Sequence, residues 1–161
     1  MRARLLTVVA VVALIGPAAV EAVPRPARSA QEPACPATAF QPKPPNAWMG
    51  SLSTRWLRRG TLWMGYTRAD TAFVADPRGQ KIGWFRDNGS KWGRLRVSGR
   101  RLDGEAPALR ADISAKYPFK EGFTASALYF SSPGCWRVVA RLGVSTRYVF
   151  VIRVEPAPPL R

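Results

Sequence analysis

The last third of the chain alternates apolar and basic residues with a period of two, and this pattern constrains the fold most strongly. Over residues 136–142 and 148–154 an apolar residue occupies every second position, and arginines occupy several positions between them. Because successive side chains of a β-strand point to opposite faces, the pattern predicts two half-buried strands. A turn near Gly143 predicts that these strands pair in antiparallel orientation.

Shorter apolar runs precede this pair and are separated by turn residues. They predict strands at residues 61–66, 71–75, 81–86, 94–98 and 123–130. The turns are rich in Gly, Pro, Asn and Asp, which favour the tight backbone conformations that join strands. No helical period is sustained, and a short helix fits only within residues 47–58. The sequence therefore predicts an all-β fold, an antiparallel immunoglobulin-like β-sandwich of about 7–8 strands.

The first 22 residues have the composition of an export signal. Arg2 and Arg4 provide a basic start, residues 5–15 form an apolar core, and Val20-Glu21-Ala22 places small residues at a cleavage site. The apolar run is shorter than the roughly 20 residues that a membrane-spanning helix needs. We therefore predict a signal peptide over residues 1–22 and a secreted or extracytoplasmic protein. Retention of the segment as a membrane anchor is the alternative.

Proline content divides the rest of the chain. Residues 23–47 contain seven prolines and few large apolar residues, which predicts an extended linker or strap. Residues 48–155 carry the predicted β-sandwich domain, and residues 156–161 form a C-terminal tail. The predicted organisation is thus one sandwich domain preceded by a signal peptide and a strap.

Cys35 and Cys135 are the two cysteines of the chain. In an exported protein an even number of cysteines most simply forms a disulfide, here between the strap and a late strand. By alternation Cys135 shares a strand face with Arg137, whereas Trp136 points into the core. The bridge should therefore hold the strap against the outside of a sheet; two free thiols are the alternative. Metal binding is not expected, because the chain has no histidine and no CxxC pair.

The chain is strongly basic, with 25 basic residues, 10 acidic residues and a formal net charge of +15. This excess favours anionic partners: cell-wall polymers, acidic lipid head groups through peripheral membrane contact, or nucleic acid. An exported protein is not expected to meet nucleic acid in the cell. Twenty of the basic residues are arginine, and abundant Arg, Ala, Pro and Gly also fit a GC-rich genome. A compositional origin of the charge therefore stays open.

Seven aromatic and basic residues form the predicted ligand surface: Trp84, Arg86, Lys91, Trp92, Arg94, Arg100 and Arg101. Adjacent Trp84 and Phe85 must point to opposite faces of a strand, so one of them is expected to be exposed. Exposed rings beside arginine and lysine can stack on sugars or bases. The alternative is that Trp84 and Trp92 pack together as a cross-strand pair. For the two adjacent arginines we favour a structural role, in which one ties a strand end to Asp103.

No catalytic arrangement stands out in the sequence. The absence of histidine excludes Ser-His-Asp and Cys-His mechanisms, and no GxGxxG, P-loop or GxSxG motif is present. Most acidic residues lie in turns beside Gly or Pro, where aspartate stabilises the backbone. We therefore predict a non-enzymatic module without cofactor or metal, which binds an anionic envelope component or stabilises a surface assembly. The alternatives are a domain that recognises or inhibits another exported protein and, with less support, a carboxylate-based hydrolase.

Two segments resemble a set of uncharacterised exported bacterial proteins that have a small immunoglobulin-like sandwich. Residues 98–104 contain a GRRLD segment, residues 132–139 contain a PGCW segment, and Gly122-Phe123 adds to the likeness. The resemblance covers roughly residues 60–154. It implies the sandwich fold and an extracytoplasmic location but no activity, and it implies that Trp136 takes the place of a corner tyrosine. The expected disulfide departs from the immunoglobulin pattern, because Cys35 lies in the strap.

Overall fold

Strands account for most of the chain that the structure describes. The structure is a computed structural model, and it describes residues 34–42, 46–52, 55–66, 72–87, 94–115, 122–144 and 146–158. The predicted signal peptide and the first part of the predicted strap lie outside these residues. No helix within the described ranges is long and apolar enough to cross a membrane.

One short helix and ten strands are present in the described residues. Helix α1 covers Ala47–Leu52 and is capped by Asn46, whose Oδ1 accepts the Met49 N–H at 2.8 Å. The strands are β1 (Phe40–Gln41), β2 (Trp56–Arg59), β3 (Leu62–Tyr66), β4 (Phe73–Ala75), β5 (Gln80–Arg86), β6 (Leu95–Arg101), β7 (Arg110–Ile113), β8 (Phe123–Tyr129), β9 (Gly134–Leu142) and β10 (Thr146–Pro156).

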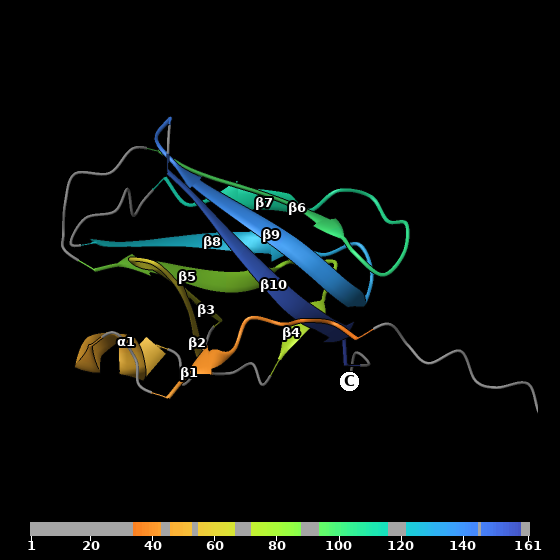
Figure 1. Cartoon of the computed structure of the whole chain (residues 1–161), viewed down its shortest axis with the longest axis horizontal. Coiled ribbons are helices and arrows are strands. Elements are labelled where there is room, and N and C mark those ends of the chain that lie inside the picture. The colour runs from red at the N-terminus through yellow and green to blue at the C-terminus, as the bar shows by residue number, and fades with distance from the viewer. Residues whose placement is uncertain are drawn as a thin grey trace, which may run out of the picture. The chain divides into compact units, whose positions relative to one another are not determined.

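The strands form two sheets that pack face to face (Figure 1). The six-stranded sheet has the order β1-β2-β3-β5-β8-β7 and is antiparallel throughout. The four-stranded sheet has the order β4-β10-β9-β6; only its β4–β10 pair is parallel in the described residues. Inward side chains of both sheets, including Trp84, Trp136 and Phe150, fill the core between them.

The connectivity confirms the immunoglobulin-like sandwich. In that fold one sheet contains strands A, B, E and D, and the other contains G, F and C. The order β3-β5-β8-β7 matches the first set, and β10-β9-β6 matches the second. The protein has more strands than predicted, because β1 and β2 extend the six-stranded sheet beyond β3 and β7 forms the opposite edge of that sheet.

The predicted disulfide is present. The Sγ atoms of Cys35 and Cys135 are 2.06 Å apart, and the Cα atoms are 5.4 Å apart. Trp136 is fully buried in the core, so Cys135 lies on the outer side of β9, as the alternation predicted. Disulfides are typical of proteins that fold outside the reducing cytoplasm.

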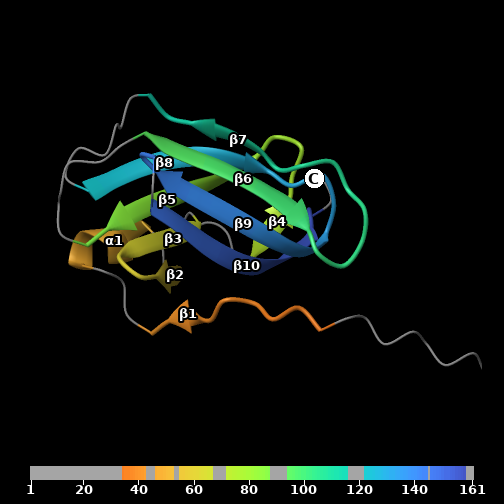
Figure 2. The same cartoon turned by 45° about the horizontal axis from the view of Figure 1, so that its top comes forward.

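The described part of the strap, residues 34–42, connects the two sheets along the edge where β10 lies (Figure 2). The Thr38 N–H donates to Val151 O at 2.7 Å, and Thr38 Oγ1 accepts the Val151 N–H at 3.0 Å. Two residues later, Phe40 of β1 pairs with Leu57 of β2. The strap thus begins on the four-stranded sheet and ends as a strand of the six-stranded sheet. It covers backbone groups of β10 that would otherwise form an open edge.

Candidate functional site

Trp84 is a core residue, which corrects the prediction that it belongs to a ligand surface. Its side chain is fully buried, and Nε1 donates to Ser126 Oγ at 2.9 Å. Its ring centroid lies 6.2 Å from that of Phe150 in the opposite sheet. Because side chains alternate along β5, the neighbouring Phe85 takes the outward position.

The other predicted residues do not form one continuous surface. Arg86 lies at the end of β5 in the six-stranded sheet. Arg94 directly precedes β6, and Arg100 lies near the other end of that strand in the four-stranded sheet. Lys91 and Trp92 lie outside the described residues. The predicted set is therefore divided between the two sheets.

Arg101 has the structural role that the sequence favoured. Its Nε donates to Asp103 Oδ1 at 2.6 Å, and Asp103 Oδ2 accepts the Cys135 N–H at 2.8 Å. The Leu102 N–H also donates to Cys135 O at 2.7 Å. Hydrogen bonds therefore join the GRRLD segment to the PGCW segment at the corner where β6 ends and β9 begins.

Two further observations assign this corner a structural role. Burial raises the pKa of the Asp103 carboxyl, but the hydrogen bonds from Arg101 and from the Cys135 N–H outweigh burial and hold that pKa below its usual value. Trp136 Nε1 donates to Ser132 O at 3.0 Å, which resembles the bond of a corner tyrosine to the backbone a few residues upstream.

Six arginines occupy outward strand positions of the four-stranded sheet, and the strand register arranges five of them in two rows. This surface, named the arginine face, consists of Arg96, Arg100, Arg137, Arg141 and Arg147. The first row crosses three strands: Arg96 of β6 lies opposite Arg141 of β9, which lies opposite Arg147 of β10. In the second row Arg100 lies opposite Arg137. Because neighbouring strands are about 4.8 Å apart, the three-residue row spans about 10 Å.

Little negative charge compensates the arginine face: among the outward strand positions of this sheet, Glu155 is the acidic residue, and it lies at the far end of β10 from Arg147. The outward positions of β6 and β9 contain no acidic residue. Within the described part of the chain, none of the five arginines forms an ion pair. Like charges directly opposite each other on neighbouring strands destabilise a sheet. The fold alone therefore gives no reason for the three-residue row.

The outer face of the six-stranded sheet is apolar instead. Met49, Trp56 and Trp63 are buried there in a second cluster, and Phe85 and Phe123 pack against it. Because Met49 belongs to α1, the helix contributes to covering this part of the sheet. Aromatic side chains therefore occupy positions that alternation would assign to solvent.

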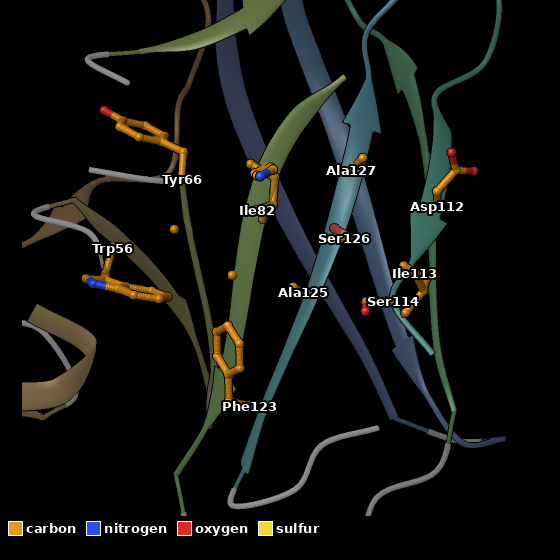
Figure 3. A pocket seen from close by; sticks show the side chains of 13 residues that line it. Trp56, Tyr66, Ile82, Asp112, Ile113, Ser114, Phe123, Ala125, Ser126 and Ala127 are labelled. Carbon is orange, nitrogen blue, oxygen red and sulfur yellow. The ribbon is translucent and has the colours of Figure 1, made fainter. Parts of the chain in front are cut away.

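A pocket with a volume of about 460 Å³ lies beside this cluster (Figure 3). Its floor consists of small residues: Gly83 of β5 lies opposite Ala125 of β8, and Ala127 is the next outward residue. Figure 3 shows Trp56 and Phe123 on one side of this floor and strand β7 on the other. A Cβ atom at Gly83 would lie 3.1 Å from the Phe123 ring and 3.3 Å from the Trp56 ring. Glycine at this position therefore keeps the two rings in place and the floor open.

Two charged residues flank the pocket. Lys81 of β5 and Asp112 of β7 lie opposite Ala127 from its two sides. Asp112 Oδ2 accepts a hydrogen bond from Arg110 Nη1 at 2.8 Å. Lys81 is exposed, and it has no ion-pair partner among the described residues. The rim therefore carries one uncompensated positive charge.

The predicted ligand surface omitted most of the arginine face. It included Arg100 but not Arg96, Arg137, Arg141 or Arg147. Alternation gives the outward position of each of these residues on its own strand, and the pairing of β6 with β9 and of β9 with β10 brings them together. The pocket left no comparable signal, because Gly and Ala in a strand do not indicate a binding site.

Metal-ligating side chains do not gather in the described part of the chain. No group of three His, Cys, Asp or Glu residues in these ranges could hold a metal ion. Each described aspartate pairs with an arginine; the pairs are Asp76–Arg78, Asp87–Arg58, Asp103–Arg101 and Asp112–Arg110.

No family model, no curated protein and no solved structure matches this chain.

Proposed function

We propose that this protein is an exported, non-enzymatic module that binds an anionic polymer of the cell envelope through its arginine face. The observation that carries the proposal is the row Arg96–Arg141–Arg147, in which three permanently charged side chains lie in register. Guanidinium groups bind carboxylates and phosphates through paired hydrogen bonds. An anion bound between neighbouring guanidiniums would also relieve their mutual repulsion.

The spacing of the two rows favours an extended ligand over a single small ion. Arg137 and Arg141 are four residues apart on β9, which corresponds to about 13 Å. Between the rows lies Val139, with Ser98 opposite. A polymer that carries repeated phosphate or carboxylate groups can engage both rows at once. Such simultaneous binding raises the overall affinity without requiring a stronger contact at either row.

An extracytoplasmic location is supported by the N-terminal sequence and by the disulfide between Cys35 and Cys135. The polyanions available there include cell-wall polymers and acidic lipid head groups. Mass spectrometry of the protein recovered outside the cytoplasm should give an N-terminus near Val23. A chain that still begins at Met1 and fractionates with the membrane would contradict cleavage of the signal.

The direct test is binding of the full chain to a linear polyphosphate and to an uncharged polysaccharide at several salt concentrations. Polyphosphate binding through five arginines should weaken roughly 100-fold to 500-fold between 50 and 200 mM salt, because bound counterions are released. The triple variant R96Q/R141Q/R147Q should bind polyphosphate at least about tenfold more weakly than the unmodified chain, since it loses three such contacts.

The matched control is R58Q/R78Q/R110Q, which removes the same charge from arginines that already pair with aspartates. This control should retain affinity within about twofold, because its residues lie outside the arginine face. Equal losses in the two triple variants would show that net charge alone drives binding and would refute the proposal. Binding of an exported protein that persists at high salt would instead favour a protein-recognition domain.

A further inference from the structure

The pocket on the six-stranded sheet is separate from the arginine face, because the two surfaces are the outer faces of opposite sheets. Its volume of about 460 Å³ lies within the range of pockets that hold small molecules. The inference that follows therefore does not depend on the proposed function.

The floor of the pocket suits an apolar group. Gly83, Ala125 and Ala127 present only methyl groups and backbone, and the backbone belongs to the β5–β8 ladder. A polar group placed on this floor would lose its hydration without gaining a partner. The half-buried Phe123 ring provides an apolar wall at one side (Figure 3).

The charged residues at the rim of the pocket indicate which chemical group the other end of the ligand carries. Asp112 is already paired with Arg110, whose guanidinium also lies over the Tyr129 ring at 3.3 Å from its centroid. Arg110 is therefore held between Asp112 of its own strand and Tyr129 of β8, and it neutralises the carboxylate that the described residues place at the rim. Lys81 remains as the positive charge without a described ion-pair partner, so the complementary ligand carries an anionic group.

We infer that this pocket binds a small amphiphilic carboxylic acid. Its apolar body lies on Ala125 and Ala127, and its carboxylate pairs with the ammonium group of Lys81. The ligand lies across the strands, since Lys81 is on β5 and the two alanines are on the neighbouring β8.

The test is a titration of the full chain, labelled at alanine methyl groups, with 4-phenylbutyrate, 4-phenylbutanol and 4-phenylbutylamine. We expect saturable shifts of the Ala125 and Ala127 methyl signals with the carboxylate, whereas the Ala140 signal stays fixed because that residue is fully buried in the core. The alcohol should bind more weakly than the carboxylate, and the amine most weakly. The variant A125L, which fills the floor, should abolish the Ala127 shift with all three probes.

A second variant tests the charge without changing the shape of the floor. K81Q should weaken 4-phenylbutyrate binding about twofold to fivefold, as expected for one exposed ion pair, and should leave 4-phenylbutanol binding unchanged. The control R78Q removes an equal charge from a turn outside the pocket and should change neither affinity. The inference is overturned if neither alanine methyl shows a saturable shift with the carboxylate. It is also overturned if the three probes bind equally well.

Discussion

The two outer faces of this sandwich carry opposite kinds of side chain at their outward positions. On the four-stranded sheet, three arginines lie in one row across β6, β9 and β10. On the six-stranded sheet, the outward positions hold Trp56 and Trp63, which are buried beside α1. The arginine face concentrates positive charge that does not stabilise the fold. The apolar face buries aromatic surface that does stabilise it.

This difference separates side chains that contribute to the stability of the fold from side chains that are available to bind a ligand. Removal of a side chain from the apolar face should cost free energy of unfolding, because that face acts as a second small core. Removal of an arginine from the arginine face should cost little or even stabilise the fold, because the neighbours repel each other. Stability measurements and binding measurements should therefore respond to different faces.

The largest effect is expected for Trp56 on the apolar face. W56A should lower the free energy of unfolding by about 3–5 kcal/mol, as for other buried tryptophans, because it leaves a cavity above Gly65 and Gly83. R96A on the other face should change stability by less than about 0.5 kcal/mol, as is usual for exposed residues. Urea unfolding of both variants provides the measurement, and similar losses for the two would break the comparison.

The disulfide should have the next largest effect, since it fastens the strap that joins the two sheets. The double variant C35S/C135S should lose about 2–5 kcal/mol of stability, because the bridge closes a long loop with a sequence separation of 100. Hydrogen exchange should accelerate at the Val151 amide, which donates to Thr38 Oγ1. Unchanged exchange at Val151 in the double variant would show that the strap stays in place without the bridge.

Arg101 differs from the arginines of the arginine face because it has an acidic partner, Asp103. D103N should cost about 1.5–3 kcal/mol at neutral pH, the range for hydrogen bonds to a charged group. Because the pKa of Asp103 is lowered in the folded protein, its contribution is complete above the unfolded pKa of about 3.9 and is lost as pH falls through the folded value. Urea unfolding between pH 7 and pH 2 should therefore show the two proteins converging in acid.

The exposed pair of Arg110 and Asp112 provides the control for this experiment. D112N should cost less than about 1 kcal/mol, because solvent screens an exposed ion pair. If D103N and D112N lost equal stability, the corner between β6 and β9 would have no special structural role.

The smallest expected effect is also the most diagnostic one for the arginine face. R141Q removes the middle of the three-residue row and should raise stability by about 0.2–1 kcal/mol at low salt, the range for cross-strand pairs. The gain should disappear in 1 M salt, where charges are screened beyond about 3 Å. Thermal unfolding at the two salt concentrations measures this change. Destabilisation by R141Q at low salt would mean that the row supports the fold and is not kept for a ligand.

Local alternation was sufficient to predict much of the fold. It predicted β9 and β10, with Trp136 and Phe150 inward, because these long strands place one face in the core. It did not predict β1, β2 or β7, which are short. Strand β1 has two residues in a proline-rich segment, and β2 begins inside the stretch, residues 47–58, in which the sequence predicted a short helix. These strands depend on pairing with distant parts of the chain, which local patterns do not contain.

The candidate site was predicted less well for the same reason. Arg137 and Arg141 are visible as outward residues of one strand, but their alignment with Arg96 requires the register between β6 and β9. Trp84 was placed at the surface because an adjacent aromatic pair must divide between two faces. Its inward position follows from the core and from its bond to Ser126, which lies 42 residues further along the chain.

The bridge from Cys35 has a mechanical consequence. Cys135 lies opposite Arg153 in the β9–β10 register, close to the end of β10. A pull applied to the chain before Cys35 and after β10 would therefore enter and leave the domain at neighbouring points. The pulling force would act on a few hydrogen-bonded residue pairs at this end of the β9–β10 ladder. While these pairs stay intact, the segment between the two cysteines would bear no tension. The covalent bond would also limit how far the domain could extend once the ladder opened.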